Sequence, residues 1–297
     1  MEVAVAKREK VIFILGSTGT GKSKLAIELA TRFSGEIINS DKIQVYQGLD
    51  VVTNKVSAEE QSLVRHHLLG VVDDPDADFT AEDFRSAVRR SIESIVGRGK
   101  VPIIAGGSNS YIESLVDDEF QEKYDTCFLW IDVTLSVLHM FVSQRVDQMV
   151  EEGLVEEVRK AFHPEGDYSR GIRRAIGVPE MDSYFKEEEK LNGTERAILL
   201  AKAIKEIKDN TCKLSCNQRK KIIRLRELLG WDINRLDATA VFLKSGIQAD
   251  KAWEELIRKP AVTRVSEFLV INVDQAVDHD PAATTEAATM ATTEAPL

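Results

Sequence analysis

Short apolar runs alternate with helical patterns in the first half of the chain, which is typical of a parallel sheet covered by helices on both faces. The four predicted strands are Val11–Leu15, Glu36–Asn39, Val101–Ala105 and Cys127–Val133. A helical pattern follows the first strand and carries Leu25, Leu29 and Phe33 on one face. We therefore expect an α/β core over residues 11–134.

From Leu135 onward the pattern is helical and no further strand is predicted. The helix that begins there has an apolar stripe through Leu138, Val142, Val146 and Met149, with Arg145 at its edge. A second face runs from Leu200 to Leu225 and is interrupted by a polar residue, Gln218. These stripes predict a helical subdomain over residues 135–269, with return contacts to the core.

The two ends of the chain have little to bury. Residues 1–10 have mixed charge and no apolar run, so we expect an N-terminal extension that is neither a secretory signal nor an intact transit peptide. Residues 276–297 are rich in Ala, Thr, Glu and Pro, which predicts a disordered tail. The expected location is intracellular, in the plastid or the cytosol, with no targeting segment visible in the sequence.

Composition and charge narrow the classes of protein that fit. Among 297 residues, 39 Lys and Arg oppose 49 Asp and Glu, for a net charge of −10, and 43% of residues are hydrophobic. The acidic balance gives no support to nucleic-acid binding, and no run is long enough to span a membrane. Three cysteines without zinc-site spacing argue against a disulfide-linked or zinc-binding fold. These numbers indicate an intracellular globular enzyme or binding protein and do not distinguish the two, and we expect a monomer.

A phosphate-binding loop lies between the first strand and the first helix. Its eight residues fit the pattern G-x-x-x-x-G-K-[ST] and are Gly16, Ser17, Thr18, Gly19, Thr20, Gly21, Lys22 and Ser23. Glycines let backbone N–H groups surround an anion, Lys22 adds a full charge, and the Ser23 hydroxyl is a candidate ligand for Mg²⁺. The loop predicts a P-loop NTPase-like core with a di- or triphosphate site. It leaves open whether that phosphate is hydrolysed, transferred or a leaving group.

Asp41 follows the second predicted strand. The carboxyl ends of parallel strands meet at one edge of a sheet, so this carboxylate is expected near the phosphate loop. A turn or helix-cap role is the alternative. Asp132 ends the fourth predicted strand, where a magnesium contact and a turn cap are equally compatible with the sequence. His66 and His67 have no partner set for a metal, and a structural role is expected for them.

Several motifs in chain order resemble the isopentenyltransferase family, which contains adenylate isopentenyltransferases and tRNA dimethylallyltransferases. They are GSTGTGKS, NSDKIQVYQGLDVVTNK, HHLLG, AGGSNSYIESLV, FLWIDV and GIRRAIGVPEMDSYF. The variants DKIQVY and GGSNSY resemble the plant adenylate enzymes that make cytokinins. The resemblance extends from about Val11 to Leu269 and lacks the zinc finger of eukaryotic tRNA enzymes.

This resemblance implies a reaction. The loop would hold the diphosphate of dimethylallyl diphosphate, and adenine N6 of ATP, ADP or AMP would attack the prenyl carbon. Asp41 would take a proton from N6, which is a poor nucleophile because its lone pair is delocalised. Thr18 would orient the amine, while Lys22, Arg145 and Mg²⁺ would stabilise the departing diphosphate.

The acceptor site is less defined by the sequence. Its candidate residues are Gln44, Ser108, Arg173, Arg174 and Gln218. Ion pairing with nearby acids is the alternative for the two arginines, and bonding to backbone is the alternative for the Gln218 amide. Family members usually carry Arg-Gln where this chain has Asn217-Gln218, which leaves the contact to the acceptor phosphates open.

Other functions remain possible on the sequence alone. A tRNA dimethylallyltransferase would use the same chemistry on a polymer. A small-molecule or nucleotide kinase is what the loop by itself favours, and a non-catalytic nucleotide-binding switch would need the loop alone. These alternatives predict different products from the same substrates.

Overall fold

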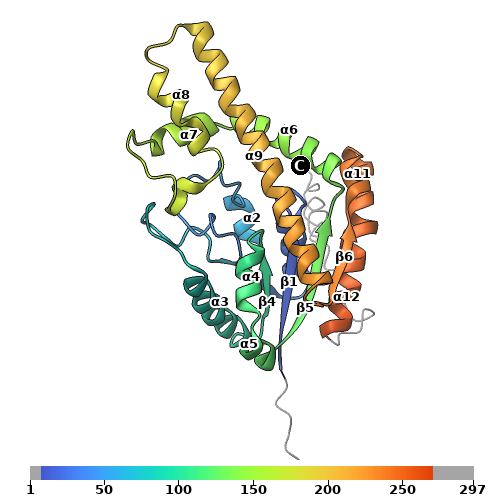
Figure 1. The fold of residues 1–297 in the computed structure, drawn as a ribbon. Coiled ribbons are helices and arrows are strands. Elements are labelled where there is room, and N and C mark those ends of the chain that lie inside the picture. The colour runs from blue at the N-terminus through green and yellow to red at the C-terminus, as the bar shows by residue number, and fades with distance from the viewer. Residues whose placement is uncertain (1–7, 270–297) are drawn as a thin grey trace, which may run out of the picture.

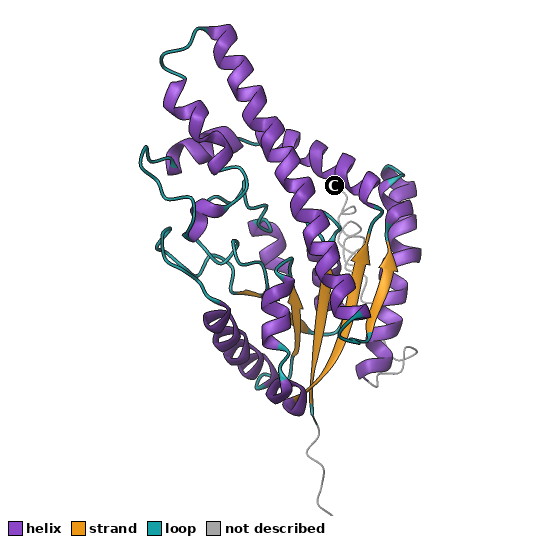
Figure 2. Cartoon of the chain, viewed as in Figure 1, coloured by secondary structure: helices purple, strands orange, loops and turns teal. Residues whose placement is uncertain are grey.

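The computed structural model describes residues 8–269, and within them a six-stranded parallel sheet forms the centre of the molecule (Figure 2). The strands are β1 (Glu9–Gly16), β2 (Gly35–Asn39), β3 (His66–His67), β4 (Val101–Ala105), β5 (Tyr124–Asp132) and β6 (Ile233–Asp237). Their order across the sheet is β3-β2-β4-β1-β5-β6. The predicted α/β fold is confirmed, and the four predicted strands are β1, β2, β4 and β5.

The register of the strands brings the polar chain segments to one edge. Gly16 pairs with Ile131, and Asn39 pairs with Ala105. The phosphate loop, the segment after β2 and the turn after β4 therefore emerge side by side at the carboxyl end of the sheet. This is the edge at which open α/β sheets bind ligands.

Helices cover both faces of this sheet and extend beyond it. The α-helices are α1 (Lys22–Arg32), α2 (Ala58–Leu63), α3 (Ala81–Val96), α4 (Asn109–Leu115), α5 (Asp118–Lys123), α6 (Leu135–Glu151), α7 (Leu154–Ala161), α8 (Asp182–Glu187), α9 (Gly193–Glu227), α10 (Thr239–Phe242), α11 (Gly246–Trp253) and α12 (Lys259–Leu269). Two 3₁₀ turns, η1 (Gly171–Arg174) and η2 (Pro179–Met181), and a π-helical segment, η3 (Glu254–Arg258), complete the order.

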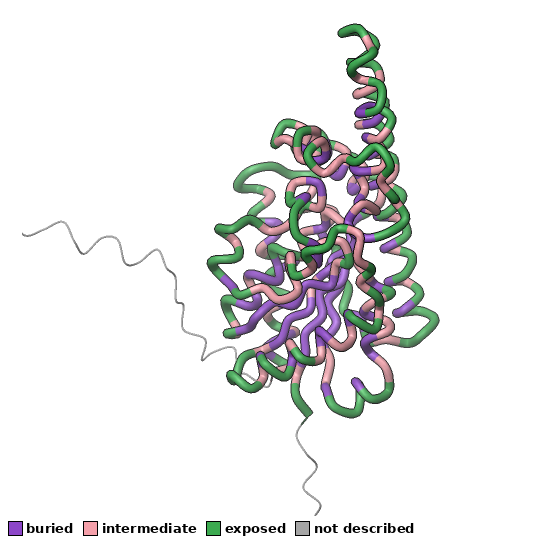
Figure 3. The backbone as a smooth tube through the Cα atoms, turned by 90° about the vertical axis from the view of Figure 1, so that its left-hand side faces the viewer, coloured by how far each residue is buried: buried purple, intermediate pink, exposed green. Residues whose placement is uncertain are grey.

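Each face of the sheet has its own apolar core, and the strands form the buried centre of Figure 3. Residues of α1, α6, α11 and α12 pack on one face, and residues of α3, α4, α5 and α9 pack on the other. A third cluster joins the segment after β2 to α6, α7, α8 and the N-terminal half of α9. Figure 1 shows α9 running from this third cluster down to the sheet.

The prediction that strands end before Leu135 is wrong. After α9 the chain returns to the sheet as β6, which pairs with β5 from Phe128↔Ile233 to Asp132↔Asp237. β6 is an edge strand in which only Ile233 and Leu236 are buried, so its sequence lacks a continuous apolar run. The two-residue strand β3 was not predicted either, because it is too short to give a pattern.

No helix among the described residues is long and apolar enough to cross a membrane. The predicted tail, 276–297, lies outside the described residues, and so does most of the predicted N-terminal extension.

Candidate active site

The phosphate loop joins β1 to α1 and is held in shape by its own side chains. Thr20 Oγ1 donates a hydrogen bond to Ser17 O at 2.9 Å, and Lys22 Nζ donates to the same carbonyl at 2.7 Å. Gly19 and Gly21 have φ of +82° and +92°, which glycine adopts without strain. Gly21 is also the N-cap of α1, so the free N–H groups of the helix begin at the loop. This arrangement suits an anion.

Arg145 reaches the loop from the edge of α6. Its Nη2 donates a hydrogen bond to Thr18 Oγ1 at 2.8 Å. The Thr18 oxygen therefore acts as an acceptor toward Arg145, and its own hydrogen is available for a second partner. The sequence predicted both residues for the site but did not predict that they contact each other, because 127 positions separate them.

Two half-buried cations, Lys22 and Arg145, line the cavity beside the loop. Burial lowers the pKa of Lys22 to about 8, against the opposing effect of Asp41, and Arg145 lowers it further. Burial also lowers the pKa of Arg145 to about 10. Within residues 8–269 neither side chain forms an ion pair, so a ligand with several negative charges would be stabilised here.

Asp41 uses one carboxylate oxygen to shape its own turn. Its N–H donates to Asn39 Oδ1 and its Oδ1 accepts from the Ile43 N–H, each at 3.0 Å. The second oxygen, Oδ2, makes no hydrogen bond to another described residue and points toward Gly107, where an added Cβ would lie 3.6 Å away. The turn role and a proton-accepting role are therefore compatible, since each uses a different oxygen.

Gln218 of α9 ties together the loop and the turn after β4. Its Oε1 accepts from the Thr18 N–H at 2.7 Å, and its Nε2 donates to Gly107 O at 3.1 Å. A Cβ added at Gly107 would overlap Gln218 Nε2, so a larger residue there would displace this amide. The Gln218 backbone carbonyl also accepts from Asn109 Nδ2 at 3.1 Å. The Gln218 amide therefore bonds to backbone groups, which was one of the two predicted alternatives. Gln218 also lines the first cavity.

Two adjoining cavities meet above the loop. The first, of about 270 Å³, is lined by the loop, Asp41, Gln44, Gln218 and other residues. The second, of about 260 Å³, has a more apolar wall that includes Ile43, Val146, Met149, Leu154 and Ile207. Five residues line both cavities: Thr18, Asp41, Thr53, Asn54 and Arg145. The phosphate end of the site is thus continuous with an apolar compartment, and Asp41 lies at their junction.

The predicted acceptor residues lie in different places. Arg174 lines the second cavity, whereas Arg173 is paired with Asp76, with Nε 2.7 Å from Oδ1. Ser108 Oγ accepts from the Lys42 N–H at 3.0 Å. Arg174 is therefore the arginine of this pair that reaches the cavity.

Gln44 lines the first cavity while its Nε2 ties down the cavity wall. That nitrogen donates to Thr53 O at 3.0 Å and to Asn54 O at 3.1 Å. Glu157 of α7 accepts from the N–H groups of Val51 and Val52 in the same wall, at 3.0 and 2.8 Å. The segment 49–55 is thus held from both sides.

Asp132 requires a correction. Its side chain is 2% exposed and accepts from Arg219 Nε and Arg235 Nε, each at 2.8 Å. Asp132 is not among the residues that line either cavity, and no side-chain cap is found at the start of α6. The strand end is correctly located, but β6 and α9 flank it and supply two guanidinium groups that the sequence did not place there.

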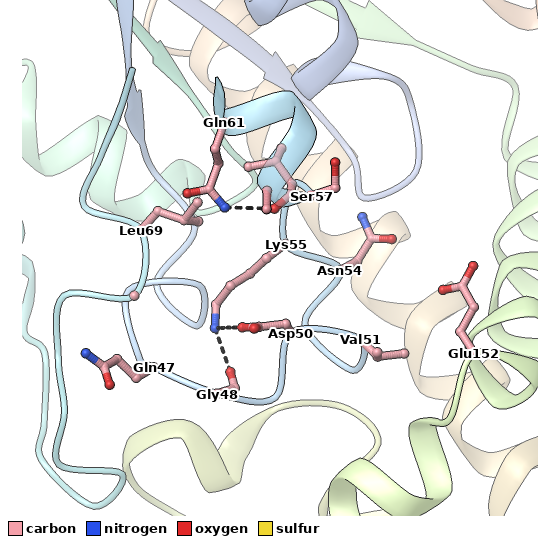
Figure 4. A pocket seen from close by; sticks show the side chains of 13 residues that line it. Gln47, Gly48, Asp50, Val51, Asn54, Lys55, Ser57, Gln61, Leu69 and Glu152 are labelled. Atoms are coloured by element: carbon pink, nitrogen blue, oxygen red, sulfur yellow. Dashed lines mark hydrogen bonds and ion pairs between the residues drawn. The ribbon is translucent and has the colours of Figure 1, made fainter. Parts of the chain in front are cut away.

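A third cavity, of about 580 Å³, lies on the other side of the 49–55 segment (Figure 4). Lys55 projects into it and donates to Gly48 O at 2.6 Å and to Asp50 Oδ1 at 2.6 Å. The third cavity shares Asn54, Val56 and Leu69 with the first. The two cavities therefore adjoin each other at these residues.

Some cavity residues lie in the quoted motifs but were not predicted as site residues. His66 lines the first cavity, and its Nδ1 lies 2.8 Å from Val64 O, whereas His67 lies 2.7 Å from Glu36 and is paired with it. Thr53 and Asn54 lie in the quoted NSDKIQVYQGLDVVTNK motif, but nothing in their residue types marked them as site residues.

The sequence of this chain is similar to a known protein family and to named plant enzymes. The model of the IPP transferase family matches residues 44–122 and 117–222. The chain is 56% identical over 274 residues to adenylate isopentenyltransferase 5, chloroplastic, of Arabidopsis thaliana, which covers 90% of this chain and 82% of that protein. The chain belongs to the IPP transferase family. A second IPP transferase relative, the adenylate isopentenyltransferase of Humulus lupulus, is 40% identical, covering 86% of this chain and 89% of that one.

Solved structures of IPP transferases share the fold. A eukaryotic dimethylallyltransferase acting on tRNA aligns with a TM-score of 0.75 at 25% identity, covering 88% of this chain and 80% of that one. A tRNA isopentenylpyrophosphate transferase of Staphylococcus epidermidis aligns with a TM-score of 0.70 at 24% identity, covering 88% and 100%. Both relatives named here have "adenylate" in their names, whereas the titles of both solved structures named here refer to tRNA.

Proposed function

We propose that this prenyltransferase moves the dimethylallyl group of dimethylallyl diphosphate to N6 of the adenine of ATP, ADP or AMP and releases diphosphate. The observation that carries the proposal is the junction of the two cavities. A cationic, loop-lined cavity suits the donor diphosphate, an apolar one suits a purine, and Thr18, Asp41 and Arg145 line both. The names of the adenylate isopentenyltransferase relatives support the same substrates.

The bond changes assign a task to each group at the junction. A bond forms between N6 and the prenyl C1, while the C1–O bond breaks and its electron pair leaves with the diphosphate. Asp41 Oδ2 accepts the N6 proton as the nitrogen becomes positive, which removes the barrier posed by a weakly basic aromatic amine. The Thr18 hydroxyl, fixed by Arg145, orients the reacting amine.

Negative charge gathers on the diphosphate as it departs. Lys22 and Arg145 line the cavity beside the start of α1, where free N–H groups begin, so fixed positive charge is available to stabilise the departing diphosphate. The low pKa of Lys22 reflects a cation held in a poorly solvated site. Such a site binds a trianionic group much more strongly than water would.

We take the metal to be Mg²⁺. The residues present suit it only as an ion bound mainly through the substrate phosphates and water, with few protein ligands. No group of three His, Cys, Asp or Glu among residues 8–269 makes a dedicated metal site, and Asp132 is occupied by arginines. Mg²⁺ usually keeps several waters and binds through substrate phosphates and few protein ligands. Ser23 lines the first cavity and would hold it there. When bound, the metal neutralises charge on the diphosphate.

Lys42 and Arg174 line the second cavity, and Lys221 is close enough to Lys42 to affect its pKa. These three cations are candidates to hold the acceptor phosphates. Burial lowers the pKa of Lys42, and Arg174 and Lys221 lower it further against the opposing effect of Asp41. Within residues 8–269 none of these three forms an ion pair, although Arg174 Nε donates to Gly171 O. We propose that these three cations bind the acceptor phosphates in place of the arginine that family members usually carry at the position of Asn217. Arg173, which is paired with Asp76, would not take part.

We further propose that the acceptor is a free nucleotide, that no nucleic acid or membrane is bound, and that the protein acts as a monomer. The net charge of −10 supports the first point, because tRNA binding needs a cationic surface. The names of several relatives include "chloroplastic", which supports the plastid over the cytosol for this chain.

A parallel acceptor assay tests the function. The protein with Mg²⁺ and dimethylallyl diphosphate is offered AMP, ADP, ATP and unmodified tRNA separately, and products are resolved by mass. A gain of one C5 unit on a free nucleotide is expected, with tRNA unmodified. Transfer to tRNA alone would reverse the choice of acceptor, and phosphoryl transfer from ATP without the prenyl donor would indicate a kinase.

A further inference from the structure

The C-terminal helices bring an aromatic ring against the back of the phosphate loop. Trp253, the last residue of α11, is 5% exposed and belongs to the apolar core that α1 and α6 share on this face of the sheet. A Cβ added at Gly21 would lie 2.8 Å from the Cζ3 and Cη2 atoms of the Trp253 ring. The six-membered ring therefore occupies the space beside Gly21, the N-cap of α1.

Two further contacts fix this ring relative to α1. Its Nε1–H donates to both carboxylate oxygens of Glu28, each at 3.0 Å, and the Lys24 ammonium lies 4.7 Å from the ring centroid. Burial raises the pKa of the Glu28 carboxyl, with the indole hydrogen bond opposing that shift. The indole is thus held by two residues from successive turns of the helix whose first turn carries Lys22 and Ser23.

The chain after Trp253 explains how the ring is kept in this position. The π-helical segment η3 begins at the next residue and leads into α12. Ile257 of η3 and Ala261 and Val265 of α12 are fully buried in the same core. A π-helical turn changes the direction of side chains relative to a regular helix, and such turns are frequent at functional sites. The ring is therefore anchored on one side by a packed helix and on the other by α1.

We propose that Trp253 is a positioning residue for diphosphate binding: its ring fixes Gly21 and the first turn of α1, and thereby directs Lys22, Ser23 and the free N–H groups at the ligand. The proposal rests on the proposed function only in treating the loop as the diphosphate site. Trp253 does not line the first cavity, so it acts through the loop.

The test uses the wild-type chain, Trp253→Phe and the control Trp231→Phe. Trp231 packs on Phe128, with ring centroids 4.9 Å apart, in the core on the opposite face of the sheet. Each protein is titrated with inorganic diphosphate and Mg²⁺ by calorimetry and by tryptophan emission. We expect Trp253→Phe to weaken diphosphate binding roughly tenfold and to lose the emission change, while Trp231→Phe keeps both. Wild-type affinity in Trp253→Phe, or a persisting emission change, would overturn the proposal.

Steady-state kinetics separate positioning from a general loss of stability. For Trp253→Phe we expect the KM for dimethylallyl diphosphate to rise with the weakened binding, while the KM for the adenine nucleotide and the thermal midpoint stay near wild type. A lower midpoint and lower kcat with both KM values unchanged would show a purely structural role. If Trp253→Phe does not fold, Glu28→Ala, which releases the indole N–H, decides: severalfold weaker diphosphate binding supports the proposal and unchanged binding contradicts it.

The outcomes also distinguish this inference from the proposed function. A wild-type chain that binds diphosphate in a Trp253-dependent manner but transfers no prenyl group would overturn the proposed function and leave the inference standing. Prenyl transfer that proceeds equally well in Trp253→Phe, with unchanged diphosphate affinity, would do the reverse.

Discussion

The two carboxylate oxygens of Asp41 have different roles: Oδ1 holds the turn, and Oδ2 is the proposed proton acceptor. Asp41→Asn keeps an oxygen that can accept from the Ile43 N–H, so the turn is expected to persist. It removes the proton acceptor, so kcat should fall by about 10²–10⁴. Because Asp41 raises the pKa of Lys22, the comparison is best made at about pH 6.5, where Lys22 stays protonated in both proteins. Calorimetry with diphosphate should give near-wild-type binding. Turnover at the wild-type rate would remove Asp41 from the mechanism.

The lowered pKa of Lys22 predicts how donor use depends on pH. Lys22 carries its charge below its pKa of about 8 and loses it as pH rises through that value. The diphosphate needs the charged form, so kcat/KM for dimethylallyl diphosphate should decline above pH 8. In Lys22→Arg, whose guanidinium stays protonated, any remaining activity should extend to higher pH. A wild-type profile that is flat beyond pH 9 would contradict this assignment.

At the residue scale, site residues could be predicted where a short motif or a strand end marks them in the sequence. The loop pattern and the strand-end position of Asp41 predicted residues that do line one cavity. It could not predict the Arg145–Thr18 contact or the position of Trp253, because these depend on helix packing between distant segments. No motif marks an aromatic residue 232 positions after the glycine against which it packs.

At the scale of elements, α9 is the helix that contacts both the phosphate loop and the end of β5. Its Ser215 carbonyl accepts from Ser17 Oγ at 2.8 Å, and one turn later Gln218 binds the Thr18 N–H. Arg219 then pairs with Asp132 at the end of β5. The helix thus holds the phosphate loop at two points and is itself fixed on the sheet by an ion pair.

This arrangement predicts the effect of removing the Gln218 amide. Gln218→Leu leaves the Thr18 N–H and the Gly107 carbonyl without their partner, a loss worth about 1–3 kcal/mol for a buried group. Diphosphate binding should weaken, and calorimetry measures it. Asn217→Leu is the matched control, because Asn217 is exposed and should bind diphosphate as the wild type does. Equal diphosphate affinities in the two variants would show that the hydrogen bonds of the Gln218 amide do not shape the loop.

The elements that the sequence missed share a physical cause. β6 is short, lies at the edge of the sheet and buries only two side chains, so solvent-facing polar residues dominate its pattern. β3 has two residues. The strands with continuous apolar runs were predicted correctly because they are buried on both faces.

At the scale of the whole molecule, Asp132 joins β5, β6 and α9 and so links the C-terminal part of the chain to the core. Asp132→Asn removes the negative charge that Arg219 and Arg235 share, and the free energy of unfolding should fall by about 2 kcal/mol. Asp237→Asn, which disrupts an exposed pair with Arg235, should cost less than about 0.5 kcal/mol. Denaturant unfolding measures both. A variant at 132 that instead shifted the Mg²⁺ dependence of activity at unchanged stability would restore the metal role.

The sequence could not foresee this link, because Arg219 and Arg235 are 87 and 103 positions from Asp132. Chain-wide resemblance predicted the fold and the reaction type, whereas the return of the chain to the sheet as β6 followed only from the structure.

The proposed reaction is tested most directly by locating the bond that the enzyme makes. Wild-type protein is incubated with Mg²⁺, dimethylallyl diphosphate and AMP or ATP, and the nucleotide product is fragmented by mass spectrometry while released diphosphate is counted. We predict one C5 unit on adenine N6 for each diphosphate released. A prenyl group elsewhere on the nucleotide, or a phosphorylated product with the donor intact, would contradict the account.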